Sequence, residues 1–298
     1  MLWHTTRFRI DLSSPTVMGI VNVTPDSFSD GGSHADAKSA LAHCEQLLKE
    51  GAGILDIGGE SSRPGAPTLS AEDEWARVEE VLKGALTLGV PISLDTCKPR
   101  VMRQALDLGV DIINDIRALQ VPGAELAIVE HGQCGVCLMH MQGDPATMQS
   151  RPQYSDVLGE VRTFLHERVQ ALVVQGVSRD RLCLDPGIGF GKTPQHNLDL
   201  LRRQNELLDS GLPLLVGWSR KSTLGHVTGK PVGDRLAASL AAALASVHQG
   251  AKVVRVHDVA ATVDALKLWA ASEIPPISWT SASHSAPQSN TPLTPHSL

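Results

Sequence analysis

Short apolar runs alternate with longer amphipathic stretches along most of the chain. The apolar runs are rich in Val, Ile and Leu, which favours buried strands, and the amphipathic stretches have the spacing of helices that cover a sheet. We predict strands at residues 17–23, 54–57, 92–94, 112–114, 136–139, 182–185, 214–217 and 253–256. We predict helices at residues 35–50, 71–88, 99–108, 124–130, 156–175, 197–208, 234–249 and 260–271, and a helix-like turn after Lys221.

This alternation predicts the fold class. A Gly stands at each join from helix to strand, as at Gly109 and Gly132, where it fits the left-handed residue that ends many helices. Strand–helix alternation indicates a parallel α/β sheet, and strands that are apolar on both faces indicate a sheet covered by helices. Eight such units in about 255 residues predict a single closed (β/α)8 TIM barrel rather than an open sheet.

The end of the chain has a different composition. After Glu273 there is no Asp, Glu, Lys or Arg, and the remainder is rich in Ser, Thr and Pro. We therefore predict one domain over residues 1–273 and a disordered tail over residues 274–298.

Charge and composition exclude several kinds of partner. The net charge is -6 and only 3% of residues are aromatic, which disfavours nucleic-acid binding. The longest apolar stretch, residues 236–247, is shorter than the ~20 residues that span a bilayer. We expect no secretory signal, because the first twelve residues contain no long apolar run, and the five Cys show no framework spacing. We expect a cytoplasmic protein with small-molecule substrates and no membrane partner.

The residues that end the strands are the candidates for chemistry, because a TIM barrel carries its active site at the C-terminal ends of its strands. Asp95, Asn114 and Asp185 form an acidic and amide group at three of these ends, and Met139 ends a fourth strand. A carboxylate that faces two adjacent N–H groups makes a charge-assisted pair, which suits a flat heterocycle with a guanidine-like edge such as a pterin. A metal site or simple capping of the strand ends are the alternatives.

A basic group stands at the neighbouring strand ends. Lys221 follows one strand, Arg255 and His257 follow the next, and Arg63 lies in the glycine-containing loop after residues 54–57. Barrels often bind phosphate at these last two strands, so the group predicts a site for a diphosphate or carboxylate. Ordinary surface ion pairs are the alternative for each cation taken alone.

An asparagine, Asn22, ends the first strand beside these cations. Its neutral amide oxygen suits Mg²⁺ that arrives with a diphosphate, because Mg²⁺ takes few protein ligands; an amide that closes the turn is the alternative.

Two further motifs do not support a site of their own. The segment GIGFGKT at residues 187–193 lacks the spacing of a nucleotide-binding loop and is better explained as a loop that brings Phe190 close to a planar ligand. Cys134 and Cys137 form a single C-x-x-C that runs into a strand, without the second pair or the helix that a zinc or redox site needs.

Seven segments together resemble the dihydropteroate synthase family, in order over about residues 15–271. They are MGIVNVTPDSFSDGG, GGESSRPGA, SLDTCKP, DIINDIRAL, LDPGIGFGKT, GWSRKS and RVHD. The resemblance implies a pterin-binding (β/α)8 barrel, usually a homodimer, that condenses 6-hydroxymethyl-7,8-dihydropterin diphosphate with 4-aminobenzoate. It also implies inhibition by sulfonamides.

The resemblance assigns roles to residues. Asp95, Asn114, Asp185 and Lys221 would hold the pterin, and Asn22 would bind Mg²⁺. The residues near the diphosphate would be Ser62, Arg63, Arg255 and His257, and those around the aminobenzoate Phe28, Asp30, Arg63, Pro64 and Ser222. We expect Asp30, Arg63, Asp95 and Lys221 to be catalytic, with Asp30 on a lid that excludes water from the reacting carbon. Ser62 departs from the family, in which Thr is more usual.

Two other functions remain possible from the sequence. One is a pterin-binding methyltransferase domain, which would need the acidic pocket but neither the lid nor the anion site of Lys221, Arg255 and His257. The other is a barrel that binds a pterin or phosphate for regulation only, which would have no use for the acidic and basic residues of the loops. Formation of dihydropteroate distinguishes the three.

Overall fold

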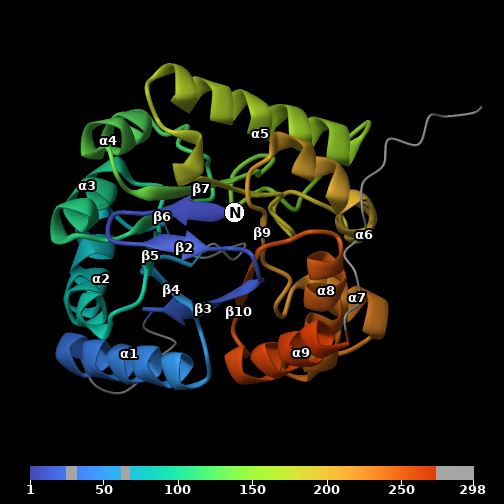
Figure 1. Ribbon diagram of the computed structural model, residues 1–298, viewed down its shortest axis with the longest axis horizontal. Coiled ribbons are helices and arrows are strands. Elements are labelled where there is room, and N and C mark those ends of the chain that lie inside the picture. Colours follow the sequence, from blue (N-terminus) through green and yellow to red (C-terminus); the bar gives the residue numbers. More distant parts are fainter. Residues whose placement is uncertain (25–31, 62–67, 273–298) are drawn as a thin grey trace, which may run out of the picture.

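The barrel predicted from the sequence is confirmed in the computed structural model, which describes residues 1–24, 32–61 and 68–272. Eight parallel strands pair in the order β8-β7-β6-β5-β4-β3-β10-β9, and a bridge between Leu184 and Leu214 closes the ring (Figure 1). The strands are β3 (Thr16–Asn22), β4 (Ile54–Gly58), β5 (Ile92–Asp95), β6 (Ile112–Asp115), β7 (Gly135–Met139), β8 (Leu182–Asp185), β9 (Leu215–Val216) and β10 (Val253–Val256).

Helices surround the strands, so that the apolar outer face of the barrel is covered (Figure 1). Helix α3 begins with Pro99 at its first position and ends at Gly109, whose φ of 99° is the left-handed conformation expected of a glycine stop. The helices are α1 (Gly32–Lys49), α2 (Ala71–Ala85), α3 (Pro99–Leu108), α4 (Ala124–His131), α5 (Val157–Val174), α6 (Pro194–Arg203), α7 (Ser222–Thr228), α8 (Leu236–His248) and α9 (Val259–Ala271).

The predicted and observed elements differ mainly at their ends. The predicted helix 71–88 is α2 followed by a 3₁₀ turn, Leu86–Leu88. The predicted helix 197–208 begins earlier, because the Thr193 hydroxyl caps α6, and it continues from Gln204 to Ser210 as a 3₁₀ helix. The predicted tail, residues 274–298, lies outside the described residues.

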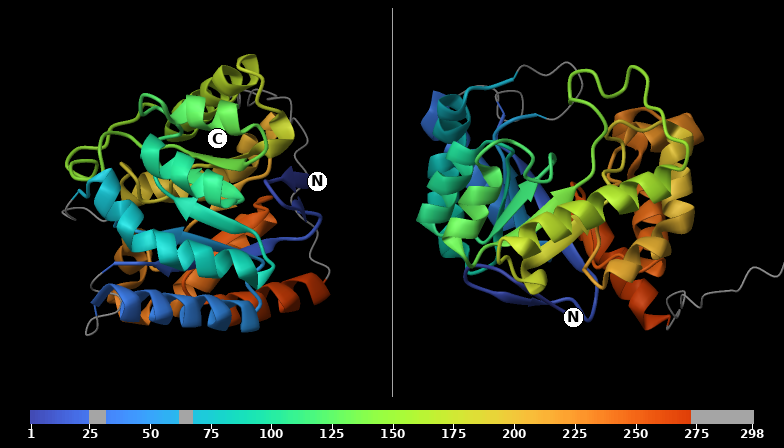
Figure 2. Two further views of the ribbon diagram at one scale, coloured as in Figure 1. Left: turned by 90° about the vertical axis from the view of Figure 1, so that its left-hand side faces the viewer. Right: turned by 90° about the horizontal axis from the view of Figure 1, so that it is seen from above.

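A short hairpin that the sequence did not predict covers one end of the barrel. Strands β1 (Leu2–His4) and β2 (Arg9–Asp11) pair antiparallel, and each is too short to show a clear alternation of apolar and polar residues. The Trp3 indole is completely buried and donates to the Arg181 carbonyl at 2.9 Å. Arg181 precedes β8, so the hairpin lies at the N-terminal ends of the strands, opposite the loops that follow them (Figure 2, right).

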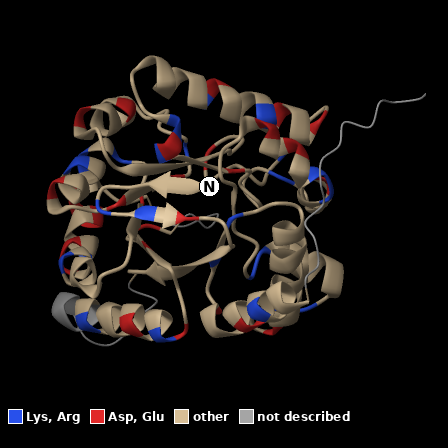
Figure 3. Cartoon of the chain, viewed as in Figure 1, with Lys and Arg blue, Asp and Glu red and all other residues tan. Residues whose placement is uncertain are grey.

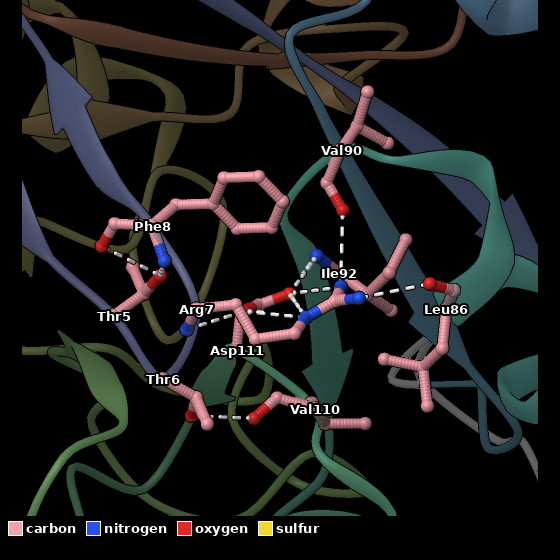
Figure 4. A network of polar contacts seen from close by, with 9 residues as sticks. All are labelled: Thr5, Thr6, Arg7, Phe8, Leu86, Val90, Ile92, Val110 and Asp111. Atoms are coloured by element: carbon pink, nitrogen blue, oxygen red, sulfur yellow. Dashed lines mark hydrogen bonds and ion pairs between the residues drawn. The ribbon is translucent and has the colours of Figure 1, made fainter.

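The hairpin is fixed to the barrel by an ion pair. Arg7 lies in the hairpin turn, and its guanidinium binds the carboxylate of Asp111, which immediately precedes β6 (Figure 4). Below the strands, Trp3 and Leu12 join a fully buried layer with Met18, Ile54, Ile112, Cys137, Cys183, Leu215 and Val253. This end of the barrel is therefore filled, and the opposite end is the place for a site.

In the view of Figure 3, segments of Lys and Arg and segments of Asp and Glu are interspersed along the surrounding helices. No helix in the described ranges is both long and apolar enough to cross a membrane.

Candidate active site

Arg255 lies at the centre of a charged cluster at the C-terminal ends of the strands. It projects from β10, and its guanidinium donates through Nε to Asp56 Oδ2 at 2.5 Å and through Nη2 to Asp95 Oδ2 at 2.8 Å. Asn114 Nδ2 donates to the same oxygen of Asp56 at 3.2 Å. The acidic group from β4, β5 and β6 and a cation from β10 therefore meet at one end of the barrel, as the sequence predicted for Asp95, Asn114 and Arg255.

Burial brings several of these groups close to neutral pKa values. Desolvation raises the pKa of Asp95 to about 7, although Arg255 opposes the shift. Burial likewise raises the pKa of Asp185 to about 6, against a hydrogen bond of 2.7 Å from the Gly187 N–H to its Oδ1. For Lys221, burial and the nearby Arg255 lower the pKa to about 8. Such shifts are typical of functional sites, where charged groups are held away from water to act on a ligand.

Lys221 lies above an aromatic ring. Its ammonium is 4.1 Å from the centroid of Phe190, a cation–π contact between the loop after β9 and the loop after β8. The preceding residue, Arg220, has a left-handed φ of 61°, and its guanidinium pairs with Asp258 at 2.6 Å. The residue before Lys221 thus has a strained backbone conformation and contacts Asp258, which directly precedes α9.

His257 stands two residues after Arg255. Its Nδ1 lies 3.0 Å from the Ser219 hydroxyl, and the same hydroxyl accepts the His257 backbone N–H at 3.2 Å. This contact links the end of β10 to the segment that follows β9, so His257 and Lys221 belong to neighbouring loops, as predicted.

Ser222 and Met139 occupy two further positions around the site. Ser222 begins α7 and lines a cavity of about 470 Å³ together with residues 149–153, 192–194 and 223. Met139 ends β7 directly beside Asp185 in the strand register and is 3% exposed. A methyl group placed on the Gly187 Cα would approach Met139 Cγ to 3.3 Å, so Met139 packs closely against the loop after β8.

Asn22 ends β3 and is partly exposed, in register with Gly58 of β4. Its amide oxygen is a hard, neutral ligand of the kind that Mg²⁺ accepts. Within the described ranges, no three His, Cys, Asp or Glu side chains gather in a way that would hold a metal without other ligands. An Mg²⁺ ion that arrived already bound to a diphosphate would need few ligands of this kind from the protein.

Five predicted site residues lie outside the described residues: Phe28, Asp30, Ser62, Arg63 and Pro64. Asp56 is not among the predicted site residues, although its carboxylate forms an ion pair with Arg255. The sequence signal that could have identified Asp56 is its position on β4, because β4 lies between the strands of the acidic group and those of the basic group. The thiols of Cys134 and Cys137 are free. Burial raises the pKa of Cys134, and the contact with Cys183, followed by burial, raises the pKa of Cys137.

Fold and site together define a barrel that presents carboxylates, an amide and cations at one open end, as an enzyme that binds a flat, nitrogen-rich ring and an anion would. The sequence profile of a family described as "Pterin binding enzyme" matches residues 18–257. Dihydropteroate synthase of Neisseria meningitidis serogroup B is 55% identical over 276 residues, which are 91% of this chain and 97% of the relative.

Two solved structures are similar over nearly their whole length. Dihydropteroate synthase of Yersinia pestis, with a sulfonamide drug complex, is 45% identical with a TM-score of 0.86, covering 91% of this chain and 99% of that one. The enzyme of Burkholderia cenocepacia, complexed with 7,8-dihydropteroate, is 47% identical with a TM-score of 0.82, covering 91% and 96%. The chain belongs to the pterin binding enzyme family and, within it, to the dihydropteroate synthases, which are transferases of folate synthesis.

Proposed function

We propose that this chain joins 6-hydroxymethyl-7,8-dihydropterin diphosphate to 4-aminobenzoate, with Mg²⁺ bound at Asn22, and releases 7,8-dihydropteroate and diphosphate. The observation that carries the proposal is the meeting of Asp56, Asp95 and Arg255 at the open end of the barrel, with Lys221 in the adjacent loop. The product complex of the Burkholderia relative supports the same reaction.

The acidic side of the site binds the pterin. Asp95, Asn114 and Asp185 offer acceptor oxygens to the ring N–H groups, and Asp185 stays oriented by the Gly187 N–H at 2.7 Å. Phe190 supplies an apolar surface and Lys221 a cation beside the ring. A bound N–H donor favours the charged form of Asp95 and Asp185, which opposes the cost of their burial.

The basic side receives the leaving group. The bond between the pterin methylene carbon and the diphosphate oxygen breaks, and its electron pair leaves with the diphosphate. Arg255 and His257, together with the predicted Ser62 and Arg63, stabilise that charge. When bound, Mg²⁺ would add further neutralisation of the phosphate oxygens. The carboxylates of Asp95, Asp185 and the predicted Asp30 face the positive charge that develops on the ring and its methylene.

The aromatic amine completes the exchange. Its nitrogen lone pair forms the new C–N bond, and the proton that it loses passes to solvent or to the departing diphosphate. We place the aminobenzoate beside Ser222, whose cavity of about 470 Å³ adjoins the loop of Lys221, with Phe28 and Pro64 as its further predicted neighbours. The cavity's position supports entry of the second substrate from this side.

The test is product formation from the purified protein, Mg²⁺, the pterin diphosphate and labelled 4-aminobenzoate. We expect labelled dihydropteroate, and we expect a sulfonamide to raise the KM for 4-aminobenzoate without changing that for the pterin. Pterin binding without product in the presence of both substrates and Mg²⁺ would contradict the transferase and favour a binding role.

We also propose that the chain acts as a homodimer in the cytoplasm. Three exposed apolar side chains lie close together in the sequence: Val227 on α7 (60% exposed), Val232 between α7 and α8 (56%) and Leu236 on α8 (43%). They offer an apolar surface that a second copy would cover. All five Cys are free thiols, as a reducing compartment would keep them. Sedimentation should show a dimer that Val232→Glu weakens and Val174→Glu, at an 85% exposed position on α5, leaves intact.

A further inference from the structure

The lysine of the GIGFGKT loop is buried although it lies outside the cluster around Arg255. Lys192 follows β8 and is only 2% exposed. Its ammonium lies 2.9 Å from His140 Nδ1, 3.0 Å from the carbonyl oxygens of Gly187 and Phe190, and 3.3 Å from the His140 carbonyl. Three of these acceptors are backbone carbonyl oxygens and the fourth is an imidazole nitrogen. The Asp185 carboxylate attracts the ammonium and opposes the fall of its pKa, but the two do not form an ion pair at contact distance.

The chemistry of the neighbouring ring supports this arrangement. Burial and the adjacent ammonium lower the pKa of His140 to about 3, so its imidazole is neutral near pH 7. With its proton on Nε2, the neutral ring accepts a hydrogen bond from the ammonium at Nδ1. Burial lowers the pKa of Lys192 itself to about 7, which shows how costly this position is for a charge. Within the described ranges this buried cation makes no ion pair, so its burial calls for another explanation. We find it in the residues whose carbonyl oxygens accept its hydrogen bonds.

Two of the acceptors belong to residues that serve the pterin site. Gly187 donates its N–H to Asp185 Oδ1 at 2.7 Å, and Phe190 presents its ring to Lys221 at 4.1 Å. Lys192 bonds the carbonyl oxygens of these same two residues. The Lys192 ammonium therefore bonds both the residue whose N–H orients Asp185 and the residue whose ring contacts Lys221.

The remaining contacts join this loop to the loop after β7. Gly187 has a φ of 69°, and a Cβ at this position would lie 1.9 Å from the His140 carbonyl oxygen, so the two backbones touch. The hydroxyl of Tyr154 donates to the Gly191 carbonyl at 2.8 Å. Without the ammonium, three converging carbonyl oxygens would lose their shared donor, and the two loops would separate or rearrange.

We propose that Lys192 is a positioning residue for pterin binding: it gathers the carbonyl oxygens of His140, Gly187 and Phe190 and thereby holds Asp185 and Phe190 in place. It does so without touching the pterin, although its nearly buried side chain also borders the cavity beside Ser222. The inference rests on the proposed function for the identity of the ligand, so its test measures pterin binding directly as well as turnover.

The experiment compares Lys192→Met, which keeps the length of the side chain but removes the ammonium, with the unchanged chain. We expect the dissociation constant of 6-hydroxymethyl-7,8-dihydropterin diphosphate, measured by calorimetry with Mg²⁺, to rise at least about tenfold. In steady-state assays the KM for the pterin should rise by a clearly larger factor than that for 4-aminobenzoate, whose proposed cavity Lys192 borders with a side chain that is only 2% exposed. Lys252→Met, which removes a lysine bonded to the Ser13 carbonyl at the closed end, is the matched control and should leave both unchanged.

The outcomes separate this inference from the proposed function. A folded Lys192→Met protein with unchanged pterin affinity would overturn the positioning role, and so would equal increases in both KM values. Should Lys192→Met fail to fold, His140→Phe decides: it keeps a ring against Phe164 but removes the Nδ1 acceptor, and we expect pterin affinity about threefold weaker, with no change refuting the role. Binding by the unchanged chain without product would contradict the transferase alone.

Discussion

The ion pair at the closed end of the barrel gives a sharp prediction about stability. Arg7 donates to both oxygens of Asp111, through Nε to Oδ1 at 3.1 Å and through Nη2 to Oδ2 at 2.6 Å. Its Nη1 also donates to the Leu86 carbonyl at 2.8 Å, and Nη2 to that of Val90 at 3.2 Å (Figure 4). Arg7→Ala removes all of these contacts and leaves behind a carboxylate that lies buried in the native fold.

The expected cost follows from burial. Asp111 is fully buried, whereas the Arg7 side chain is 32% exposed. Breaking a fully buried pair costs roughly 3–5 kcal/mol, and a partly exposed partner reduces that figure. Asp111 also keeps the backbone N–H groups of Arg7 and Ile92, at 3.0 and 2.9 Å. We therefore expect Arg7→Ala to lower the free energy of unfolding by about 2–3 kcal/mol, or about 3–5 °C in Tm.

Urea unfolding of Arg7→Ala beside Arg9→Ala measures this cost. Arg9 is an exposed neighbour on β2 and should change the free energy of unfolding by less than about 0.5 kcal/mol. Product formation at 25 °C should stay unchanged in both, because the hairpin lies opposite the site. Equal stability losses in the two variants would refute the reasoning, as would a double-mutant cycle with Asp111→Asn that shows no coupling between the two side chains.

Three further predictions concern the open end. Lys221→Met should abolish measurable pterin binding yet raise the free energy of unfolding at pH 7 by about 1–3 kcal/mol, because burial of the charged ammonium destabilises the folded chain and lowers the Lys221 pKa to about 8. Above pH 8 the folded chain loses this proton before the unfolded chain does, so the stability difference between the variant and the unchanged chain, measured by urea unfolding, should shrink between about pH 8 and 10.5. Gly187→Ala should cost about 2 kcal/mol or more, since its Cβ would meet the His140 carbonyl, whereas Gly176→Ala, with the same left-handed backbone in open space, should cost about 1; similar Tm values would contradict the contact. Asn22→Ala should raise the Mg²⁺ concentration for half-maximal product formation about tenfold, and an unchanged titration would remove Asn22 from the metal site.

The barrel was predictable because its strands are marked by composition and its helices by their stops. Runs such as residues 182–185 are apolar on both faces, which requires cover by helices and leaves few folds. The hairpin β1–β2 was not predictable, since its strands have three residues each and are held mainly by contacts distant in sequence. The Arg7–Asp111 pair spans 104 residues, and no local pattern announces it.

The sequence predicted that Asp95, Asn114 and Arg255 lie at the same end of the barrel, but not which side chains contact one another there. Strand ends identified Asp95, Asn114 and Arg255, because parallel strands bring their C-terminal ends together. The sequence did not show that one guanidinium joins Asp56 to Asp95, since this depends on side chains that cross the barrel from β10. Lys192 received no role of its own from the sequence. Its acceptors belong to the loops after β7 and β8, and only the structure shows that these two loops are in contact.

The filled floor of the barrel also governs the movement of small molecules. Trp3 and the residues packed with it are fully buried, so the described part of the chain has no second opening at the N-terminal ends of the strands. Two reactants must arrive, and two products must depart, past the same rim. A product that stays bound at the open end therefore blocks the next substrate. Each turnover ends only when the products have left through the same opening by which the substrates entered.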